Sequence, residues 1–284
     1  MITEQVQQLI GMALAEDTGP GDITAQCFVP ADRQARAEIR AKESGIIAGT
    51  ELAVAVFHRL DPRVETEVIL GDGSPVKRGD VVLTVKGPAR AILTAERTAL
   101  NFLQRLSGIA TQTRRYVDAV ARTGAQILDT RKTTPGWRSL EKMAVRAGGG
   151  TNHRTGLYDM VMVKDNHLQT AGSLAELQAG IDLALKKQPG VKIELEADTL
   201  HQVSEFLTLR GVDVIMLDNM PLDEMRACVA LARGSGVKLE ASGGVTLSRL
   251  PEIAATGVDY ISSGALTHSV KALDLSLDFE GTAL

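Results

Sequence analysis

The second half of the chain alternates short apolar runs with segments of helix length, and no other feature constrains the fold as much. Six apolar runs follow one another, at 126–128, 160–163, 191–195, 212–217, 237–239 and 258–261. Helix-length segments separate most of them, at 173–187, 200–209, 222–233 and 248–255. Continuous apolar strands are buried on both faces, which indicates a parallel sheet. A run of this length without a reversal signal favours closure into a (β/α) barrel, and a doubly wound open sheet is the alternative.

The first third of the chain has a different rhythm and predicts a smaller α+β unit. Residues 33–91 are strand-like around a helical stretch at 50–60, and 94–121 is a long helical pattern. We expect that helix to break near Ser107 and Gly108. Residues 273–279 return to a period of two, so we expect them to rejoin the sheet of the first unit.

Composition narrows the class of protein. The chain has 284 residues, 44% hydrophobic and 23% charged, which excludes an intrinsically disordered chain and a membrane bundle. Its net charge of −4 gives no reason to expect nucleic acid or an anionic membrane as partner. Cys27 and Cys228 are too few for a disulfide framework, and neither a signal peptide nor a spanning helix is visible. We therefore expect a cytoplasmic protein.

All six apolar runs end in polar or glycine-rich sequence. In a (β/α) barrel the chemistry lies at the carboxyl ends of the strands, where the loops converge on the mouth. One polar ending is common as a helix cap or turn, but six together favour a binding site. The endings lie at 129–135, 164–167, 194–196, 218–219, 242–244 and 262–264.

Cationic residues gather at this predicted mouth. They are Arg131, Lys132, His153, Arg154 and Lys164. Charges that follow buried strands are expensive without a partner, so we expect a polyanionic ligand. Solvated surface charge is the alternative interpretation.

Two endings, 242–244 and 262–264, are small and rich in glycine. Their backbone N–H groups at the start of helices suit a phosphate, although glycine also serves in tight turns. Glu196 and Asp218 stand on neighbouring strands, and such a pair could hold Mg²⁺ or accept hydrogen bonds from sugar hydroxyls. Alternatively, Lys164 and Arg154 neutralise these acids. Glu194 shares the alternation phase of Glu196.

A series of motifs covers nearly the whole chain and resembles that of the quinolinate phosphoribosyltransferases. The motifs are ERTALNF at 96–102, DTRKTTPG at 129–136, GGG at 148–150 with NHR at 152–154, KDNH at 164–167, MLDNM at 216–220 and ISSGALTHS at 261–269. Trp137 departs from the usual Leu of the family, and we expect it to reshape the rim of the pocket.

The resemblance implies a fold and a reaction. The expected fold is an N-terminal α/β sandwich over 1–106, joined by a C-terminal strand at about 270–284, and an incomplete α/β barrel of about seven strands over 107–269. The expected reaction joins quinolinate to phosphoribosyl pyrophosphate with Mg²⁺, and yields nicotinate mononucleotide, pyrophosphate and CO₂ in NAD biosynthesis.

The resemblance also implies roles for individual residues. Quinolinate is expected at Arg131, His153, Arg154 and Lys164, with Arg97 supplied by a second subunit, which implies a homodimer or larger homo-oligomer. Phosphoribosyl pyrophosphate is expected at Lys132, Lys164, Ser242, Gly243, Gly244, Ser263 and Gly264, and Thr130 is expected to bind substrate. Glu196 and Asp218 are expected to hold the metal, and these two acids with Lys132 and Lys164 are the expected catalytic residues.

Three other functions compete with this interpretation. A paralogue associated with molybdenum transport shares the fold but lacks the intact NHR and KDNH motifs found here. A non-catalytic protein that binds a phosphorylated ligand would explain the glycine loops but not the paired acids among cations. A nicotinate-specific transferase would need fewer carboxylate-binding cations.

Overall fold

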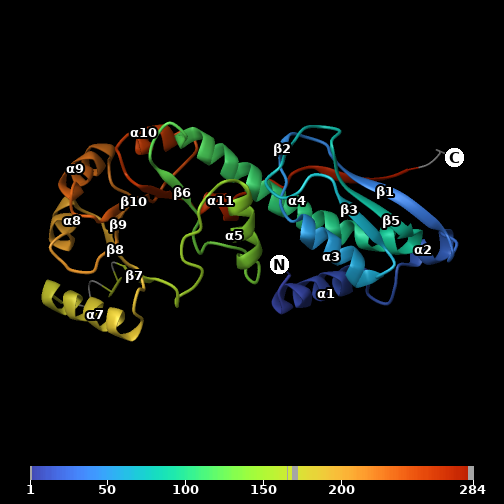
Figure 1. The fold of residues 1–284 in the computed structure, drawn as a ribbon, viewed down its shortest axis with the longest axis horizontal. Helices are drawn as coiled ribbons and strands as arrows, with labels where there is room; N and C mark the ends of the chain where they lie inside the picture. Colours follow the sequence, from blue (N-terminus) through green and yellow to red (C-terminus); the bar gives the residue numbers. More distant parts are fainter. Residues whose placement is uncertain (1, 165, 168–171, 281–284) are drawn as a thin grey trace. The chain divides into compact units, whose positions relative to one another are not determined.

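The computed structural model describes residues 2–164, 166–167 and 172–280 (Figure 1). Asp165 of the KDNH motif and residues 281–284 of the expected C-terminal strand lie outside them. The chain divides into two compact units. The sheet unit comprises Met1–Arg114, Pro135–Gly149 and Val270–Leu284, and the barrel unit comprises Arg115–Thr134 and Gly150–Ser269.

The sheet unit is built on a four-stranded antiparallel sheet with the order β12-β1-β5-β3. Its strands are β1 (Gln34–Ala41), β3 (Glu65–Val68), β5 (Val81–Pro88) and β12 (Leu275–Phe279), and a separate two-stranded sheet joins β2 (Gly45–Ile46) to β4 (Pro75–Val76). Its helices are α1 (Glu4–Thr18), α2 (Ile23–Phe28), α3 (Thr50–Leu60), α5 (Arg138–Ala147) and, as far as Arg114, α4 (Ala89–Val120).

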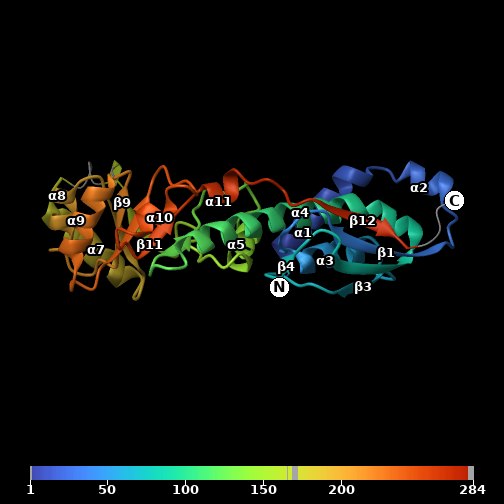
Figure 2. The same cartoon turned by 90° about the horizontal axis from the view of Figure 1, so that it is seen from above.

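The strand β12 lies beside β1, as the period-two pattern near the C-terminus predicts (Figure 2). Leu275 and Leu277 face inward and are buried, and they pair with Ala41 and Ile39 of β1. Because alternate side chains of a strand share one face, this short segment covers an edge of the sheet with apolar side chains.

The expected break in the long helix is wrong, because α4 runs without interruption from Ala89 to Val120. Ser107 and Gly108 serve close packing instead. The hydroxyl of Ser107 bonds to both backbone groups of Ala48. A Cβ at Gly108 would lie 2.3 Å from the carbonyl oxygen of Lys271, so a bare backbone is needed there. Both residues thus hold neighbouring chain segments against a continuous helix.

The barrel unit contains a parallel sheet of six strands within the described residues. Its strands are β6 (Gln126–Leu128), β7 (Val161–Val163), β8 (Ile193–Ala197), β9 (Val214–Asp218), β10 (Lys238–Ser242) and β11 (Tyr260–Ser262). Its helices are α7 (Leu174–Lys187), α8 (Leu200–Phe206), α9 (Leu222–Ala232), α10 (Leu250–Ala254) and α11 (Ala265–His268), and α7 to α10 lie outside the strands (Figure 1). The predicted alternation of strand and helix is confirmed.

The order of the strands, β6-β11-β10-β9-β8-β7, shows that this sheet is an incomplete barrel. The first strand pairs with the last, Gln126 with Tyr260, so the sheet curls round until its ends in the sequence meet. An open doubly wound sheet would not join them. On the other side of β6, Thr151 forms a single parallel bridge with Leu128, in the place of a seventh strand. Among the described residues no ladder joins this bridge to β7.

The strands β8, β9 and β10 extend further toward their carboxyl ends than the apolar runs do. Each includes polar residues that the sequence placed at or after the strand end, such as Glu196, Asp218 and Ser242. Parallel ladders hold these residues in register, Glu196 with Met216 and Asp218 with Ser242.

None of the helices described in the structure has the length and the apolar run that crossing a bilayer requires.

Candidate active site

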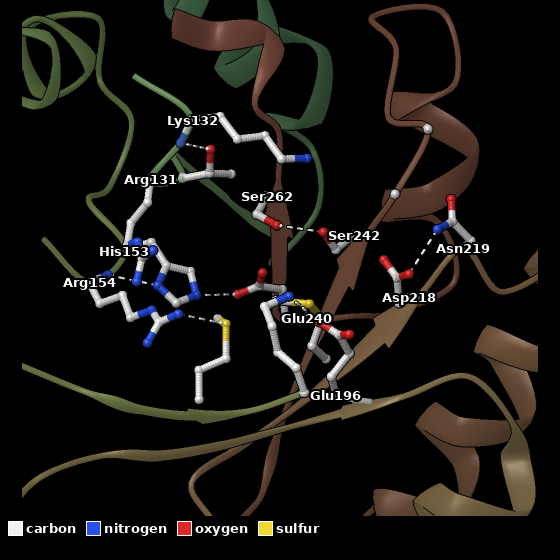
Figure 3. Close-up of a pocket in the computed structure, with 16 residues that line it drawn as sticks. Arg131, Lys132, His153, Arg154, Glu196, Asp218, Asn219, Glu240, Ser242 and Ser262 are labelled. Carbon is white, nitrogen blue, oxygen red and sulfur yellow. Dashed lines mark hydrogen bonds and ion pairs between the residues drawn. The ribbon is translucent and has the colours of Figure 1, made fainter. Parts of the chain in front are cut away.

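A cavity of about 600 Å³ opens at the carboxyl ends of the barrel strands (Figure 3). All of the residues that line it belong to the barrel unit. They are Thr130, Arg131, Lys132, His153, Arg154, Met162, Lys164, Glu196, Met216, Asp218, Asn219, Glu240, Ser242, Gly243, Gly244 and Ser262. The volume suits one or two small ligands, and the strong charge of its wall suits ions rather than apolar molecules.

Lys132 stands on a loop whose backbone is fixed at two points. Its N–H donates to the hydroxyl of Thr130 over 3.0 Å, and its carbonyl accepts from the hydroxyl of Thr267 on α11 over 2.7 Å. A Cβ at Gly264 would lie 2.8 Å from the side chain of Lys132 and 2.9 Å from the ring of His268. Gly264 therefore leaves room for the two side chains, and Lys132 is an exposed residue.

Two guanidinium groups form one side of the cavity. The side chain of Arg154 lies against Met162, with its Nη2 3.3 Å from the sulfur. Desolvation, followed by repulsion from Arg131, lowers the pKa of Arg154. Because like charges in a partly buried place repel each other, an anion bound between the two groups would relieve the repulsion.

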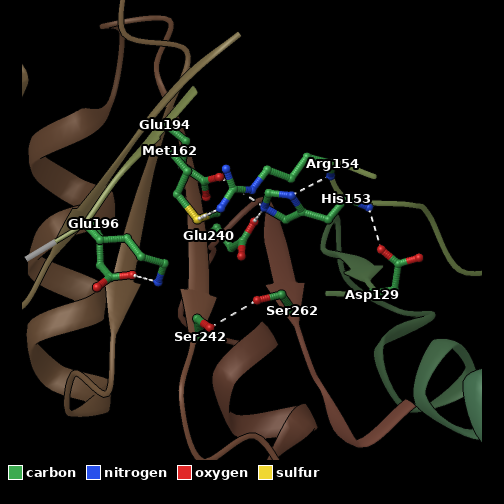
Figure 4. A network of polar contacts seen from close by, with 10 residues as sticks. Asp129, His153, Arg154, Met162, Glu194, Glu196, Glu240, Ser242 and Ser262 are labelled. Carbon is green, nitrogen blue, oxygen red and sulfur yellow. Dashed lines mark hydrogen bonds and ion pairs between the residues drawn. The ribbon is translucent and has the colours of Figure 1, made fainter. Parts of the chain in front are cut away.

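The imidazole of His153 is the centre of a buried polar network (Figure 4). Its Nε2 lies 3.0 Å from a carboxylate oxygen of Glu194 and 3.3 Å from one of Glu240. Both glutamates are almost completely buried, at 0% and 1% exposure. The backbone N–H of His153 donates to Asp129 over 2.8 Å, which fixes the loop that carries His153 and Arg154.

The charge of His153 depends on two opposing effects, its burial and the nearby carboxylates. Burial disfavours the cation, but the carboxylates of Glu194 and Glu240 outweigh it and raise the pKa of His153 to about 10. The backbone N–H of Arg154 lies 2.7 Å from Nδ1 and requires that atom to be unprotonated. One hydrogen bond contributes about 1 kcal/mol, whereas leaving a buried carboxylate without its cation costs about 3–5 kcal/mol. We therefore take the imidazolium as the resting form of His153. In this form Nδ1 carries a proton and does not accept the hydrogen bond from the backbone N–H of Arg154.

His153, Glu194 and Glu240 are also residue types that bind metal ions. Their ligand atoms lie within 4.8 Å of one another. A metal ion at Nε2 would have to displace the proton that both carboxylates stabilise. For this reason we assign the cluster to a proton and look for a metal site elsewhere in the cavity.

Glu196 and Asp218 supply carboxylate oxygens on the other side of the cavity. Glu196 is paired with Lys164, with 2.5 Å between Nζ and Oε2, so one of the ion pairs that the sequence left open is present. Asp218 accepts a hydrogen bond of 2.8 Å from the side-chain amide of Asn219. Mg²⁺ commonly takes one or two carboxylates and completes its shell with water and substrate phosphates. The chemistry of this donor pair fits that requirement.

The loop after β10 brings bare backbone to the cavity. Gly243 and Gly244 have positive φ angles of 85° and 56°, which glycine adopts without strain. The hydroxyl of Ser242 accepts from that of Ser262 over 3.1 Å, which ties β10 to β11 at the mouth.

Most of the site residues predicted from the sequence line this single cavity. Arg97, Ser263 and Gly264 are not among the described residues that line it. Arg97 lies on α4 in the sheet unit, and Ser263 is buried next to Ser262, whose side chain does reach the wall. Trp137 does not line the cavity either; it stacks on Phe102 within the sheet unit, with 4.8 Å between ring centroids.

Three residues of the wall, Met162, Met216 and Glu240, were not predicted from the sequence. Asn219 and Ser262 were predicted only as parts of the strand endings 218–219 and 262–264, without roles of their own. Glu240 has the same alternation phase as Ser242, and this phase would have placed it on the inner face. Asn219 directly follows Asp218 in a motif of the resemblance. The two methionines carry no polar signal and could not be distinguished from core residues.

Comparison with known proteins assigns both parts of the chain. Residues 22–107 match the model of the quinolinate phosphoribosyl transferase N-terminal domain, and residues 109–278 match the model of the C-terminal domain.

Similar proteins match over almost the entire chain. A probable nicotinate-nucleotide pyrophosphorylase (carboxylating) from Bacillus subtilis is 46% identical over 96% of this chain and 93% of its own length. A decarboxylating quinolinate phosphoribosyltransferase from Nicotiana tabacum is 45% identical over 98% of this chain and 83% of its own length. The solved structure of nicotinate-nucleotide pyrophosphorylase from Francisella tularensis has a TM-score of 0.90 at 38% identity, and covers 98% of this chain and 96% of that one.

Proposed function

Because the chain belongs to the quinolinate phosphoribosyltransferase family, a family of decarboxylating enzymes in NAD biosynthesis, we propose how its cavity accommodates the two substrates. The enzyme joins quinolinate to phosphoribosyl pyrophosphate and releases nicotinate mononucleotide, pyrophosphate and CO₂. One observation carries the assignment of sites. The guanidinium groups of Arg131 and Arg154 and the imidazole of His153 lie together in one part of the cavity (Figure 3). Glu196, Asp218 and the loop at 242–244 line another part, with Lys164 paired to Glu196.

Quinolinate, a dianion, binds at Arg131, His153, Arg154 and Lys164 in this proposal. Burial, followed by repulsion from Arg131, lowers the pKa of Arg154, and a carboxylate bound to both guanidinium groups would relieve this repulsion. Guanidinium groups offer paired N–H donors that match the planar geometry of a carboxylate. His153 adds a third cation, held by its two buried glutamates.

Phosphoribosyl pyrophosphate takes the other part of the cavity. The ammonium of Lys132 meets a phosphate, with Thr130 beside it, and the backbone of Ser242, Gly243 and Gly244 approaches the other phosphate group. Ser263 and Gly264 contribute indirectly, since Gly264 makes room for Lys132. Glu196 and Asp218 would hold Mg²⁺, which supplies charge neutralisation for the pyrophosphate when it is bound.

The residues act by position and charge, without a covalent nucleophile. The ring nitrogen of quinolinate attacks the anomeric carbon of the ribose as pyrophosphate departs. Glu196 and Asp218 place negative charge near the oxocarbenium-like centre, and Lys132 stabilises the charge that builds on the leaving group. After transfer, the carbon–carbon bond to one carboxylate breaks as CO₂ leaves, and its electron pair stays on the ring carbon beside the positively charged nitrogen. The surrounding cations stabilise that developing charge. The ring carbon then takes up a proton from solvent, which completes nicotinate mononucleotide.

We further propose that the active unit is at least a dimer and that the protein is cytoplasmic. Arg97, for which the family resemblance implies a role at quinolinate, is exposed on α4, with 57% of its side chain accessible. An exposed cation on another unit is suited to complete the site of a neighbouring copy. Cys27 and Cys228 are both free thiols, which suits a reducing compartment.

The decisive assay follows CO₂ release from carboxyl-labelled quinolinate. Release should require both phosphoribosyl pyrophosphate and Mg²⁺, and chelation of the metal should abolish it. Nicotinate should not be a substrate under the same conditions, because three cations exceed what one carboxylate needs. Equal turnover of nicotinate would contradict the assignment of Arg131, His153 and Arg154 to a dianion.

A further inference from the structure

Asn219 has an unusual backbone for the position that it occupies. It is the one non-glycine residue in the described part of the chain with a positive φ, at 53°. Such a conformation costs free energy for a residue with a Cβ, and it persists where the surroundings impose it. Asn219 directly follows Asp218 at the end of β9, and both residues line the cavity.

Three contacts hold Asn219 in this conformation and connect it to two parts of the site, and Figure 3 shows the one with Asp218. Its backbone N–H donates to the carbonyl of Ser242 over 2.9 Å, which ties the end of β9 to the end of β10. Its side-chain amide donates to Oδ2 of Asp218 over 2.8 Å. The amide group also fills the space where a Cβ of Gly243 would lie, with 2.3 Å to Oδ1 and 2.6 Å to Nδ2.

From this arrangement we infer that Asn219 is a positioning residue, which orients the carboxylate of Asp218 relative to the backbone of the Ser242–Gly244 loop. The inference rests on the proposed function, in which Asp218 and this loop meet the ribose, metal and phosphate groups of phosphoribosyl pyrophosphate. The amide N–H fixes one oxygen of Asp218, so the other oxygen stays directed to the cavity. Gly243 is required because the amide occupies the room for a side chain.

A positioning role and a structural role give opposite results for Asn219→Gly. Glycine accepts the positive φ without strain, so the melting temperature should stay within about 3 °C of wild type. The loss of the amide should nevertheless lower kcat/KM for phosphoribosyl pyrophosphate by about tenfold or more. The KM for quinolinate should change less than twofold, since the cationic side is intact. Asn219→Asp keeps the shape but places a second acid beside Asp218, and it should lose at least as much.

Calorimetry gives a readout that does not depend on turnover. Phosphoribosyl pyrophosphate is titrated with Mg²⁺ into each variant in the absence of quinolinate, and Asn219→Gly should bind it about tenfold more weakly. Asp218→Ala serves as the reference for the proposed function. If Asp218→Ala binds and turns over like wild type, the proposed site fails; if Asp218→Ala is defective and Asn219→Gly is not, the positioning role of Asn219 fails.

A double-mutant cycle tests the contact with Gly243 directly. Gly243→Ala should impair binding of phosphoribosyl pyrophosphate. In the Asn219→Gly background the same substitution should weaken binding much less, because the amide is gone and only the cost of alanine at φ of 85° remains, which should appear as lost stability. Gly236→Ala is the matched control, because Gly236 has φ of 83° and no atom within 4 Å of an added Cβ. It should reduce stability alone. Additive effects of Gly243→Ala and Asn219→Gly, or a drop in melting temperature that accounts for the lost activity, would overturn the inference.

Discussion

At the scale of single residues, the charge of His153 determines how the site responds to pH. With its pKa raised to about 10, the imidazolium persists through neutral pH and is lost only as the pH rises through that value. Glu240→Gln removes one of the two carboxylates that outweigh burial, so the pKa of His153 should fall. The KM for quinolinate in this variant should rise between pH 7 and pH 9, while the wild-type KM changes little over that range.

Proton NMR of the imidazole ring can follow the same change without substrate. Glu205→Gln is the control, because it removes an acid beside the exposed ring of His201 and lies outside the cavity. It should leave both the titration of His153 and the KM profile unchanged. Identical profiles for Glu240→Gln and wild type would mean that the buried glutamates do not maintain the cation.

Lys132 and Asp218 test whether residues of the cavity act in chemistry or in folding. Lys132→Ala and Asp218→Ala should each lose on the order of a hundredfold in turnover, because each removes an electrostatic partner of the transition state. Circular dichroism should remain that of the wild type, since neither side chain belongs to the apolar core. Lys187→Ala and Asp223→Ala, at exposed positions on α7 and α9, should keep full activity. Unfolding of either cavity variant would instead assign that residue a structural role.

The residues that carry charge at strand ends could be predicted from the sequence, and the pairing of Lys164 with Glu196 was one of the alternatives it offered. The buried partners of His153 could not be predicted. A cation after a buried strand is itself a signal, since its desolvation needs compensation. Glu194 and Glu240 lie within buried strands. Whether a glutamate there pairs with a cation depends on which side chain lies opposite it in the fold. His153 comes from a loop far away in the sequence, so the contact appears only in the folded barrel.

At the scale of elements, β12 shows how a short segment can stabilise a distant sheet. Leu275 is 3% exposed and pairs opposite Ala41 of β1. Leu275→Ala should lower the free energy of unfolding by about 2–4 kcal/mol, because it removes buried apolar volume and leaves a cavity. Ser276→Ala, on the other face of the same strand, should change it by less than about 0.5 kcal/mol.

Denaturant titration followed by tryptophan fluorescence measures the difference in stability between these two variants in the sheet unit. Trp137 is the single tryptophan of the sequence and stacks on Phe102 in the sheet unit. Its emission therefore reports on the surroundings that β12 helps to stabilise. Equal midpoints for Leu275→Ala and Ser276→Ala would show that the burial of Leu275 on β12 adds no stability.

The strands and helices were predictable where periodicity determines them, and less so where tertiary contacts do. The predicted segment 173–187 corresponds closely to α7, whose N-cap Ser173 accepts a hydrogen bond from the N–H of Glu176. In α4, by contrast, Ser107 and Gly108 have low helix propensity, which predicted a break. Their contacts with Ala48 and Lys271 come from segments far away in the sequence, and local propensity cannot reveal them.

At the scale of the whole molecule, closure of the barrel was not determined by the alternation of strands and helices. The same alternation fits an open sheet, because periodicity shows which residues are buried but not which strands are neighbours. The pairing of β6 with β11 decides between the two folds. The length of the run without a reversal signal and the motif resemblance both favoured the barrel. The structure shows six strands, with Thr151 bridged to β6, in the described chain.

The proposed role of Arg97 leads to a prediction about the assembly of two copies of the chain. Arg97 belongs to the sheet unit, and the residues that line the cavity belong to the barrel unit. If Arg97 completes the quinolinate site of a neighbouring copy, each site needs Arg97 from one subunit and Lys132 from the other. Arg97→Ala and Lys132→Ala should then each be inactive as pure proteins.

Mixing the two variants should restore activity. In an isologous dimer that contains one subunit of each kind, one site carries both substitutions and the other carries neither. With random exchange about half of the dimers are mixed and half of their sites are intact, so recovery should approach about a quarter of wild-type turnover. The two proteins are dissociated together, reassembled, and compared with each variant treated alone. Confirmed exchange of subunits without any recovery would place Arg97 in the site of its own chain, or outside any site, because only a site shared between copies can be rebuilt by mixing.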